Sequence, residues 1–501
     1  MIDSTNQDSE IFFGLVNPVG TDDARIIESV KKNLVDVGYN SEVIQLSKFL
    51  ENIKGLDNPF VDSDEFERIN SLMTRGNELR GISKQGDALV SASVLDIKKF
   101  RSEKNTDHDQ TKPIPRQAYI LKSLKHPKEV SLLRQIYGKS FWLISIYSPE
   151  NIRKEFLSKK IKESKYTLQD ASDKADFLIN RDQEESDEYG QNVRKTFPLG
   201  DVFIDASLVN LDSSMKRFIK LVFGYPYHTP TIDEYGMYLA QASALMASSL
   251  ARQVGASIMT EKGSVIATGT NEVPNVGGGV CNEDVGNDYR EHAKGFDSNT
   301  HHKNQLLGNF LHLLKGEKWL SKDKDKDVRD LIADFINNPK LRTAQLMNVT
   351  EFGREVHAEM TAITEAARKT SSTENCIMYC TTFPCHVCAK HIIASGIKEV
   401  VFIEPYHKSL AEDLFSDFII VDKKSDDETK IQFNPFVGIA PRRYIDIFQW
   451  PTRKEKDGSK MKWDQPNSNP RLQEEPSAIS KKEDNAVTVF LTKMAEKGIE
   501  I

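Results

Sequence analysis

The chain has 501 residues, which is long enough for two or three domains of the usual ~100–200 residues. Its 67 Lys and Arg residues against 74 Asp and Glu residues give a net charge of −7, which argues against sequence-blind capture of nucleic acid. A hydrophobic fraction of 39% excludes extensive disorder. The sequence has no apolar run near ~18 residues and its N-terminus is polar and acidic, so it predicts a cytoplasmic protein without a membrane span.

Residues 11–211 are predicted to form an α/β domain that follows a polar N-terminal tail at residues 1–10. The unbroken apolar run IFFGLV is typical of a buried strand, and the turn after it leads into an amphipathic helix that ends near Gly38. Further short strands are expected at residues 41–46, 141–147, 175–180 and 201–206. Strands that alternate with helices predict a mostly parallel sheet.

A second α/β domain is predicted over residues 231–450, after a linker at 212–230 that contains glycine and prolines. Its first element should be a long helix at 234–253, rich in Ala, Leu, Met and Ser. A β-hairpin with strands at 254–259 and 265–269 is expected next.

Two polar segments stand apart from this regular pattern. An insertion at about 274–350 interrupts the second domain and carries a helix near 304–314. The last segment, 451–501, mixes Lys, Glu, Pro and Ser. It is predicted to be a charged, partly disordered C-terminal tail with a short terminal helix.

Two predicted helix starts in the second domain carry side chains typical of metal chemistry. His357 and Glu359 stand at the start of one helix, and Cys385 and Cys388 stand at the start of the next, just after Pro384. The two cysteines are three residues apart and share a helix face, so both sulfurs can reach one metal. The histidine and the glutamate are two residues apart, so they can meet only at a site off the end of their helix.

One histidine and two cysteines form a ligand set for Zn2+, and three protein ligands are typical of catalytic zinc. A carboxylate held beside the metal, as Glu359 would be, has no role in a structural site. In the alternative interpretation, Cys376 or Cys380 supplies a fourth ligand and the zinc is structural. The H-x-E and P-C-x-x-C pattern is the signature of the zinc nucleobase deaminases.

Four segments carry a closer resemblance: VHAEM at 356–360, TTFPCHVC at 381–388, EPY at 404–406 and GTNEVP at 269–274. They resemble the deoxycytidylate (dCMP) deaminase family, over roughly residues 230–450. Thr270 and Glu272 depart from that family's Gly-Tyr-Asn-Gly-x-Pro loop. The resemblance implies a cytidine-deaminase-like α/β/α domain.

The same resemblance implies roles for individual residues. His357, Cys385 and Cys388 would bind Zn2+, and Glu359 would be the catalytic residue. Asn271 would hold the deoxyribose. Tyr406 would line the nucleotide site, and its alternative role is that of a packing aromatic at a strand end.

The implied activity is hydrolytic deamination of free deoxycytidine nucleotides, dCMP, dCTP or both, to deoxyuridine nucleotides. Zinc lowers the pKa of a water molecule toward about 7. Glu359 takes the water proton, delivers it to cytosine N3 and later protonates the departing ammonia. Two alternatives stay open: a polynucleotide cytidine deaminase, and a nucleotide- or RNA-binding regulatory module whose zinc is structural.

A glycine loop follows the first predicted strand, where a phosphate-binding loop belongs. The spacing from Gly14 to Gly20 is one residue too long for G-x4-G-K-[ST]. Thr21 stands in place of the lysine and Asp22 in place of the Ser or Thr, so the loop is a weak candidate for nucleotide binding. One alternative is a plain strand–turn–helix corner. Another is a kinase-like domain that has lost its chemistry and senses a nucleotide, binds a partner or assembles an oligomer.

The N-terminal domain resembles a P-loop kinase, in this loop and in the segment AYILKSLKHP at 118–127. A kinase-like domain joined to such a deaminase resembles the bacterial antiphage deoxycytidine-nucleotide deaminases of the DcdV/AvcD type. This resemblance implies a role in phage defence by depletion of the deoxycytidine nucleotide pool. It also implies a homo-oligomer such as a hexamer, a deoxynucleoside triphosphate effector, and an inhibitory RNA or protein partner.

Overall fold

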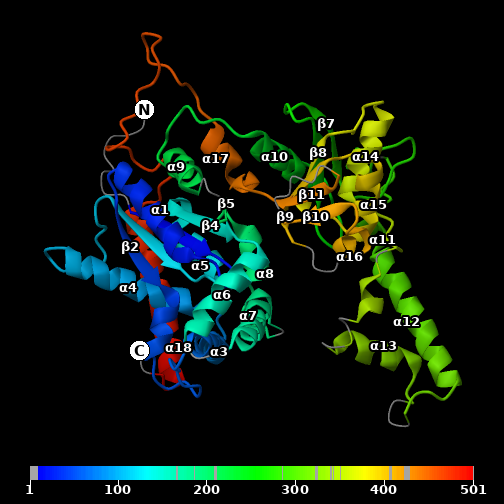
Figure 1. Cartoon of the computed structure of the whole chain (residues 1–501), viewed down its shortest axis with the longest axis horizontal. Coiled ribbons are helices and arrows are strands. Elements are labelled where there is room, and N and C mark those ends of the chain that lie inside the picture. The colour runs from blue at the N-terminus through cyan, green and yellow to red at the C-terminus, as the bar shows by residue number, and fades with distance from the viewer. Residues whose placement is uncertain are drawn as a thin grey trace. The chain divides into compact units, whose positions relative to one another are not determined.

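The computed structural model describes residues 10–499 apart from 165–166, 186, 208–210, 285, 322–324, 339–340, 342–343, 350, 406–408 and 423–428. The chain forms two compact units, each with its own sheet (Figure 1). Unit 1 contains the chain up to Glu234 and again from Val437 onward, and unit 2 is the continuous segment Tyr235–Phe436. This division differs from the predicted limits of 231–450, because the chain after Phe436 returns to the sheet of unit 1.

The described part of unit 1 contains a six-stranded sheet. Its strands are β1 (Ile11–Val16), β2 (Asn40–Gln45), β3 (Gln117–Lys122), β4 (Phe141–Tyr147), β5 (Val202–Asp205) and β12 (Gly438–Ile439). They lie in the order β12-β5-β4-β1-β3-β2, in which β1 to β5 are parallel and β12 is antiparallel to β5. The central β1 is buried on both faces, which explains its unbroken apolar sequence.

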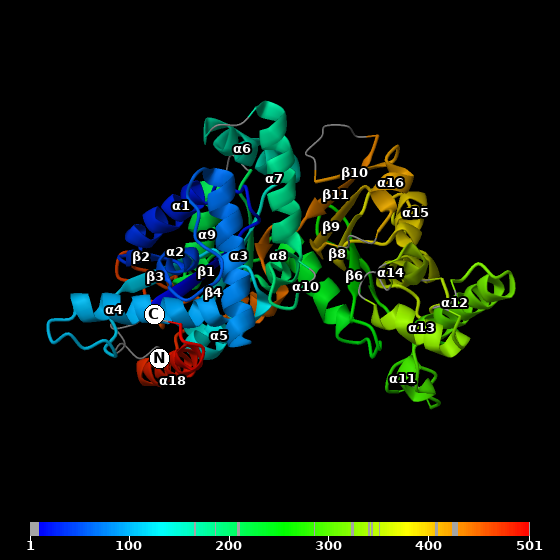
Figure 2. The same ribbon diagram turned by 90° about the horizontal axis from the view of Figure 1, so that it is seen from below.

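Helices cover both faces of this sheet. They are α1 (Asp23–Asp36), α2 (Phe49–Asn52), α3 (Glu65–Ser83), α4 (Ala88–Lys104), α5 (Pro127–Tyr137), α6 (Glu150–Ser164), α7 (Leu168–Gln183), α8 (Val193–Thr196), α9 (Leu211–Val222), α17 (Tyr444–Phe448) and α18 (Pro476–Glu496). Helices α1 and α9 pack on one face, and α4, α5 and α18 pack on the other (Figure 2). Successive side chains of β1 alternate between these two cores, so Phe12 and Phe13 lie on opposite faces.

The C-terminal segment is an ordered part of unit 1, and the prediction of a partly disordered tail is corrected here. Helix α18 buries Phe490 and Met494 in the core that it shares with α4 and α5. The guanidinium of Arg101 on α4 forms ion pairs of 2.6 Å with Glu10 and with Glu483 of α18, and all three side chains are buried. Buried charges are tolerated when they are paired, so this triad ties α18 to α4.

The described part of unit 2 contains a second sheet, in the order β10-β11-β9-β8-β6-β7. Its strands are β6 (Gly255–Met259), β7 (Val265–Thr270), β8 (Ile377–Thr382), β9 (Glu399–Glu404), β10 (Ile419–Val421) and β11 (Ile431–Pro435). The predicted hairpin is present as antiparallel β6 and β7. The remaining strands run parallel to one another, and β8 pairs antiparallel with β6.

The helices of unit 2, like those of unit 1, pack through their apolar faces. They are α10 (Ile232–Ala244), α11 (Glu291–Lys294), α12 (Ser298–Gly316), α13 (Val328–Asn337), α14 (Ala358–Arg368), α15 (His386–Ala394) and α16 (Ala411–Phe415). Helices α12 and α13, in the predicted insertion, pack on each other through a small apolar cluster of their own, away from the sheet (Figure 1). Within the described chain, no helix combines the length and the apolar character that a membrane crossing requires.

Two predicted elements are wrong. Residues 175–180, predicted as a strand, belong to helix α7. The buried residues of that helix include Ala171, Ala175, Leu178 and Ile179, which recur at helical spacing. The predicted helix at 234–253 ends early, since α10 stops at Ala244.

Candidate active site

The predicted metal ligands lie at two helix starts beside the end of β8. His357 immediately precedes α14, and Cys385 immediately precedes α15. Helix α14 lies directly against the hairpin, because Gly269 of β7 has no side chain to hold it away. A Cβ at this position would come within 2.2 Å of the Ala358 carbonyl oxygen. This close contact sets the position of the first turn of α14.

The three ligand atoms are close enough to hold one ion. The Nδ1 atom of His357 lies 3.3 Å from Sγ of Cys385 and 3.3 Å from Sγ of Cys388. Tetrahedral zinc with usual Zn–N and Zn–S bond lengths places such atoms about 3.5 Å apart. Among the described residues, Cys376 and Cys380 are not part of this group. Three ligands without a fourth cysteine are typical of a catalytic zinc site.

The ligand side chains strongly perturb one another's protonation. Hydrogen bonding by Cys388, and then by His357, lowers the pKa of the Cys385 thiol to about 4. The hydrogen bond with Cys385 raises the pKa of the His357 imidazole to about 9. The pKa of Cys388 is raised, first by its hydrogen bond to Cys385. A metal that binds here must replace the protons that these groups share.

Glu359 is a buried carboxylic acid in the first turn of α14, with 4% of its surface exposed. Burial, followed by the negative charge of Cys385, raises the pKa of its carboxyl group. A raised pKa suits a group that must both accept and donate a proton near neutral pH. Its position beside the ligand group is therefore the arrangement expected of a general acid and base.

A cavity of about 210 Å3 adjoins these groups. His357, Glu359 and Cys385 line it, and so does the sequence-predicted Asn271. The side-chain amide of Asn271 donates to the Arg252 carbonyl (2.9 Å) and accepts from the Val254 amide (2.6 Å). These bonds fix the loop before β6. The other predicted substrate residue, Tyr406, lies outside the described residues.

Residue-level prediction missed two charged residues of the cavity, Arg252 and Glu355. Arg252 forms an ion pair of 2.6 Å with Glu404. Glu355 accepts from Ser249 (2.9 Å), and its burial raises the pKa of its carboxyl group. Single charged residues before a strand or a helix form no distinctive pattern, so neither residue could be predicted as part of the site.

The departure at Glu272 has a structural explanation. The side chain is fully buried and accepts hydrogen bonds from the backbone amide (2.8 Å) and the hydroxyl (2.7 Å) of Ser248. It also accepts from the Val273 amide (2.9 Å). The carboxylate therefore holds the segment after α10 against the loop that carries Asn271.

The glycine loop belongs to unit 1. Gly14 lies within β1, where a Cβ would meet the side chains of Leu124 and Phe141 at 2.7 and 2.8 Å. Gly20 has a φ of +85°, and the Thr21 hydroxyl donates to the Pro18 carbonyl (2.8 Å). Gly20 and Thr21 line a cavity of unit 1, but Gly14 does not.

Comparisons with known proteins concern the segment that contains the zinc-site candidates. Residues 230–404 match the cytidine and deoxycytidylate deaminase zinc-binding region. The prediction of a zinc cofactor is confirmed, because this region is a zinc-binding one and the group of His357, Cys385 and Cys388 fits the metal.

Individual relatives match over shorter segments. The chain is 53% identical over 55 residues to the deoxycytidylate deaminase of Enterobacteria phage T2, which covers 11% of this chain and 29% of the phage protein. It is 42% identical over 72 residues to the human deoxycytidylate deaminase, covering 14% and 39%. The chain thus spans less than half the length of these curated relatives. A solved structure of the dCMP deaminase from cyanophage S-TIM5 with dCMP and dUMP aligns to 42% of this chain and 100% of that one, at 16% identity and a TM-score of 0.24.

Proposed function

We propose that the protein is a zinc-dependent hydrolase that deaminates free deoxycytidine nucleotides, dCMP, dCTP or both, to deoxyuridine nucleotides. One observation carries this proposal: the buried carboxyl group of Glu359 lies in the same cavity as the zinc ligands His357 and Cys385. A structural zinc site has no use for a buried acid beside it. The family match and the deoxycytidylate deaminase relatives support the same reaction.

The roles of the residues follow from their chemistry. Zinc, when bound, lowers the pKa of water so that it becomes a nucleophile at neutral pH. Glu359 would transfer one proton from the water to cytosine N3. It would then move the second proton, from the hydroxyl group formed at C4, to the amino group, which leaves as ammonia. We assign Asn271 to the sugar side of the cavity, because it lies at the cavity wall and shapes the adjacent loop. We assign Arg252, which lines the same cavity and pairs with Glu404, to the 5′-phosphate.

Ammonia release from the purified protein tests this function. The substrates are dCMP, dCTP, CMP and single-stranded DNA, each assayed with and without dTTP. Turnover of dCMP or dCTP, and none of single-stranded DNA, is the expected result. Turnover of single-stranded DNA alone would refute the proposal and favour a polynucleotide deaminase. No turnover of any substrate by the zinc-loaded protein would favour the binding module with structural zinc.

The finer parts of the proposal concern the cell. We propose that the reaction drains the deoxycytidine nucleotide pool during phage infection, and that unit 1 is a kinase-like domain that regulates it. The parallel sheet of unit 1, with a glycine loop between β1 and α1, supports the kinase-like assignment. A hexamer, a deoxynucleoside triphosphate effector and an inhibitory RNA or protein partner belong to the same proposal. Light scattering and nucleotide titrations of the deaminase rate test the hexamer and the effector.

A further inference from the structure

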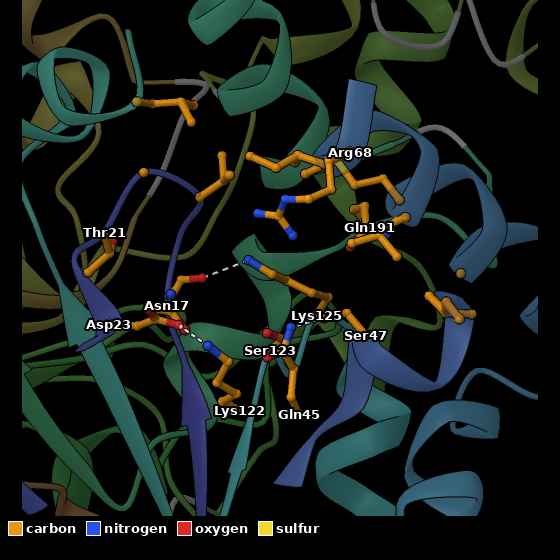
Figure 3. A pocket seen from close by; sticks show the side chains of 18 of the residues that line it. Asn17, Thr21, Asp23, Gln45, Ser47, Arg68, Lys122, Ser123, Lys125 and Gln191 are labelled. Carbon is orange, nitrogen blue, oxygen red and sulfur yellow. Dashed lines mark hydrogen bonds and ion pairs between the residues drawn. The ribbon is translucent and has the colours of Figure 1, made fainter. Parts of the chain in front are cut away.

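Unit 1 contains a cavity of about 370 Å3 at the carboxyl ends of β1, β2 and β3 (Figure 3). From β1 the chain crosses to β2, which lies beyond β3, whereas from β3 it crosses to β4, which lies beyond β1. The two connections therefore leave in opposite directions. In open parallel sheets, this is the place where ligands bind. The volume falls within the range of about 300–1,000 Å3 that is usual for small-molecule sites.

The cavity is basic, although the whole chain is acidic. Its basic lining residues are Arg68, Arg80, Lys122, Lys125 and Lys160. The carboxylates among its described lining residues are Asp23 and Glu65. Arg80 is buried against Glu129, and Arg68 is held by two hydrogen bonds to Glu65 (2.8 and 2.9 Å). The other cations at the cavity wall are Lys122, Lys125 and Lys160. A positive excess in a pocket of an acidic protein indicates an anionic ligand.

The lysine side chains of the cavity differ in the ion pairs that they form. Lys125 pairs with the buried Asp182 (2.9 Å), and Lys122 pairs with the partly exposed Asp23 (3.1 Å). Lys160 lies over the ring of Phe156 and has no carboxylate partner among the described residues. Lys160 and Lys122 can therefore reorient toward a ligand with little loss of ion-pair free energy, whereas Lys125 serves mainly to neutralise Asp182.

The polar groups of the glycine loop already form hydrogen bonds within the protein. The Val19 amide donates to the carboxylate of Asp182 (2.7 Å), and the Thr21 hydroxyl is turned back to Pro18. A phosphate loop uses its backbone amides to hold phosphate, but here a carboxylate already occupies one of them. An anion in this cavity would accordingly be held by lysine and arginine side chains. This arrangement favours binding over phosphoryl transfer.

The rest of the cavity suits a nucleoside. Leu50, Leu72 and Phe156 contribute apolar surface, which can cover a planar base. Asn17 and Gln191 are 9% and 4% exposed, and their side-chain oxygens have no hydrogen-bond partner among the described residues. Asn17 lies across the cavity from Gln191 (Figure 3). Buried acceptors of this kind are normally satisfied, so each can accept from an N–H or O–H group of a ligand.

We propose that this cavity is a second nucleotide site, which binds a nucleoside polyphosphate without turning it over. The phosphates lie against Lys122 and Lys160, and the base and sugar lie between the apolar wall and the two buried amides. The site belongs to unit 1 and uses none of the zinc-site residues, so it does not depend on the deaminase proposal.

Calorimetric titration of the full-length protein with ATP, adenosine and inorganic triphosphate, each with Mg2+, tests the site. ATP contains no cytosine, so turnover at the zinc site does not contribute heat. We expect ATP to bind, and adenosine and triphosphate to bind at least about tenfold more weakly, because each fills half of the cavity. Lys160→Ala and Lys122→Ala should each weaken ATP binding by about tenfold, as expected for loss of a charged hydrogen bond.

Lys159→Ala is the matched control, since Lys159 is exposed on the same helix as Lys160 but does not line the cavity. It should bind ATP like the unmodified protein. Absence of ATP binding at millimolar concentration would overturn the proposal, and so would equal affinity in the Lys160→Ala and Lys159→Ala variants. Equal affinities for ATP and inorganic triphosphate would overturn the assignment to a nucleotide. Production of ADP would overturn the conclusion that the site only binds.

Discussion

Replacement of Glu359 by glutamine should abolish most of the deaminase activity while leaving the metal site intact. Glutamine has nearly the same shape but cannot carry the proton between water, cytosine N3 and ammonia. General acid–base catalysis contributes about 10²–10⁴-fold to rates, or about 2.7–5.4 kcal/mol at 1.36 kcal/mol per factor of ten. Glu359 is 4% exposed, so bulk water cannot replace it. The neighbouring Glu355 is held by Ser249. We therefore expect a loss of at least about 10³-fold.

The assay is ammonia release at saturating dCMP or dCTP, with zinc content measured on the same preparation. The free energy of unfolding should change by less than about 1 kcal/mol, because the substitution removes only a charge near a helix start. Glu365→Gln is the matched control, since Glu365 lies on the same helix but pairs with Arg368 and Lys369 instead of lining the cavity. A zinc-loaded Glu359→Gln protein that keeps more than about a tenth of the rate would refute the proposed mechanism.

Three further predictions follow from other contacts. Arg252→Ala should raise KM for dCMP by about tenfold with little change in kcat. Turnover of deoxycytidine, which has no phosphate, should not change. An unaltered KM for dCMP would exclude Arg252 as the phosphate ligand. Zinc affinity of the metal-free protein should rise between pH 6 and pH 8, because the His357 imidazole, with its pKa raised to about 9, must lose a proton to bind metal. Competition with a chromophoric chelator measures this affinity, and a constant affinity over that pH range would contradict the prediction. Phe490→Ala should lower the free energy of unfolding of unit 1 by about 3–5 kcal/mol in chemical denaturation, whereas Val489→Ala, at an exposed neighbour, should change it little.

The strongest sequence predictions rested on short-range patterns. The apolar run of β1 and the starts of α14 and α15 depend on neighbouring residues, and they lie where the sequence placed them. The proximity of His357 to Cys385 and Cys388 was also predictable, because spacing on two helix starts allows few other arrangements.

The errors came from long-range packing. Helix α18 has charged residues between its apolar ones, and its burial depends on α4, which lies hundreds of residues earlier. The strand predicted at 175–180 has strand-like apolar residues, but α7 packs them through helical spacing against α3 and α6. The second cavity could not be predicted from the sequence either. Arg68, Lys122 and Lys160 are far apart in the chain and come together only through the crossover connections of the parallel strands.

The insertion of unit 2 into the chain of unit 1 has a consequence for biosynthesis. The buried ion pair of Arg101 joins residues 382 positions apart, so the ribosome must make all of unit 2 before Glu483 exists. At a synthesis rate of about 5–20 residues per second, about 20–75 s pass between the synthesis of Arg101 and that of Glu483. A nascent chain that stops before α18 therefore carries the complete zinc-ligand set while the α4 face of unit 1 is still uncovered. During this interval the half-built unit is the part of the molecule that chaperones and proteases can reach.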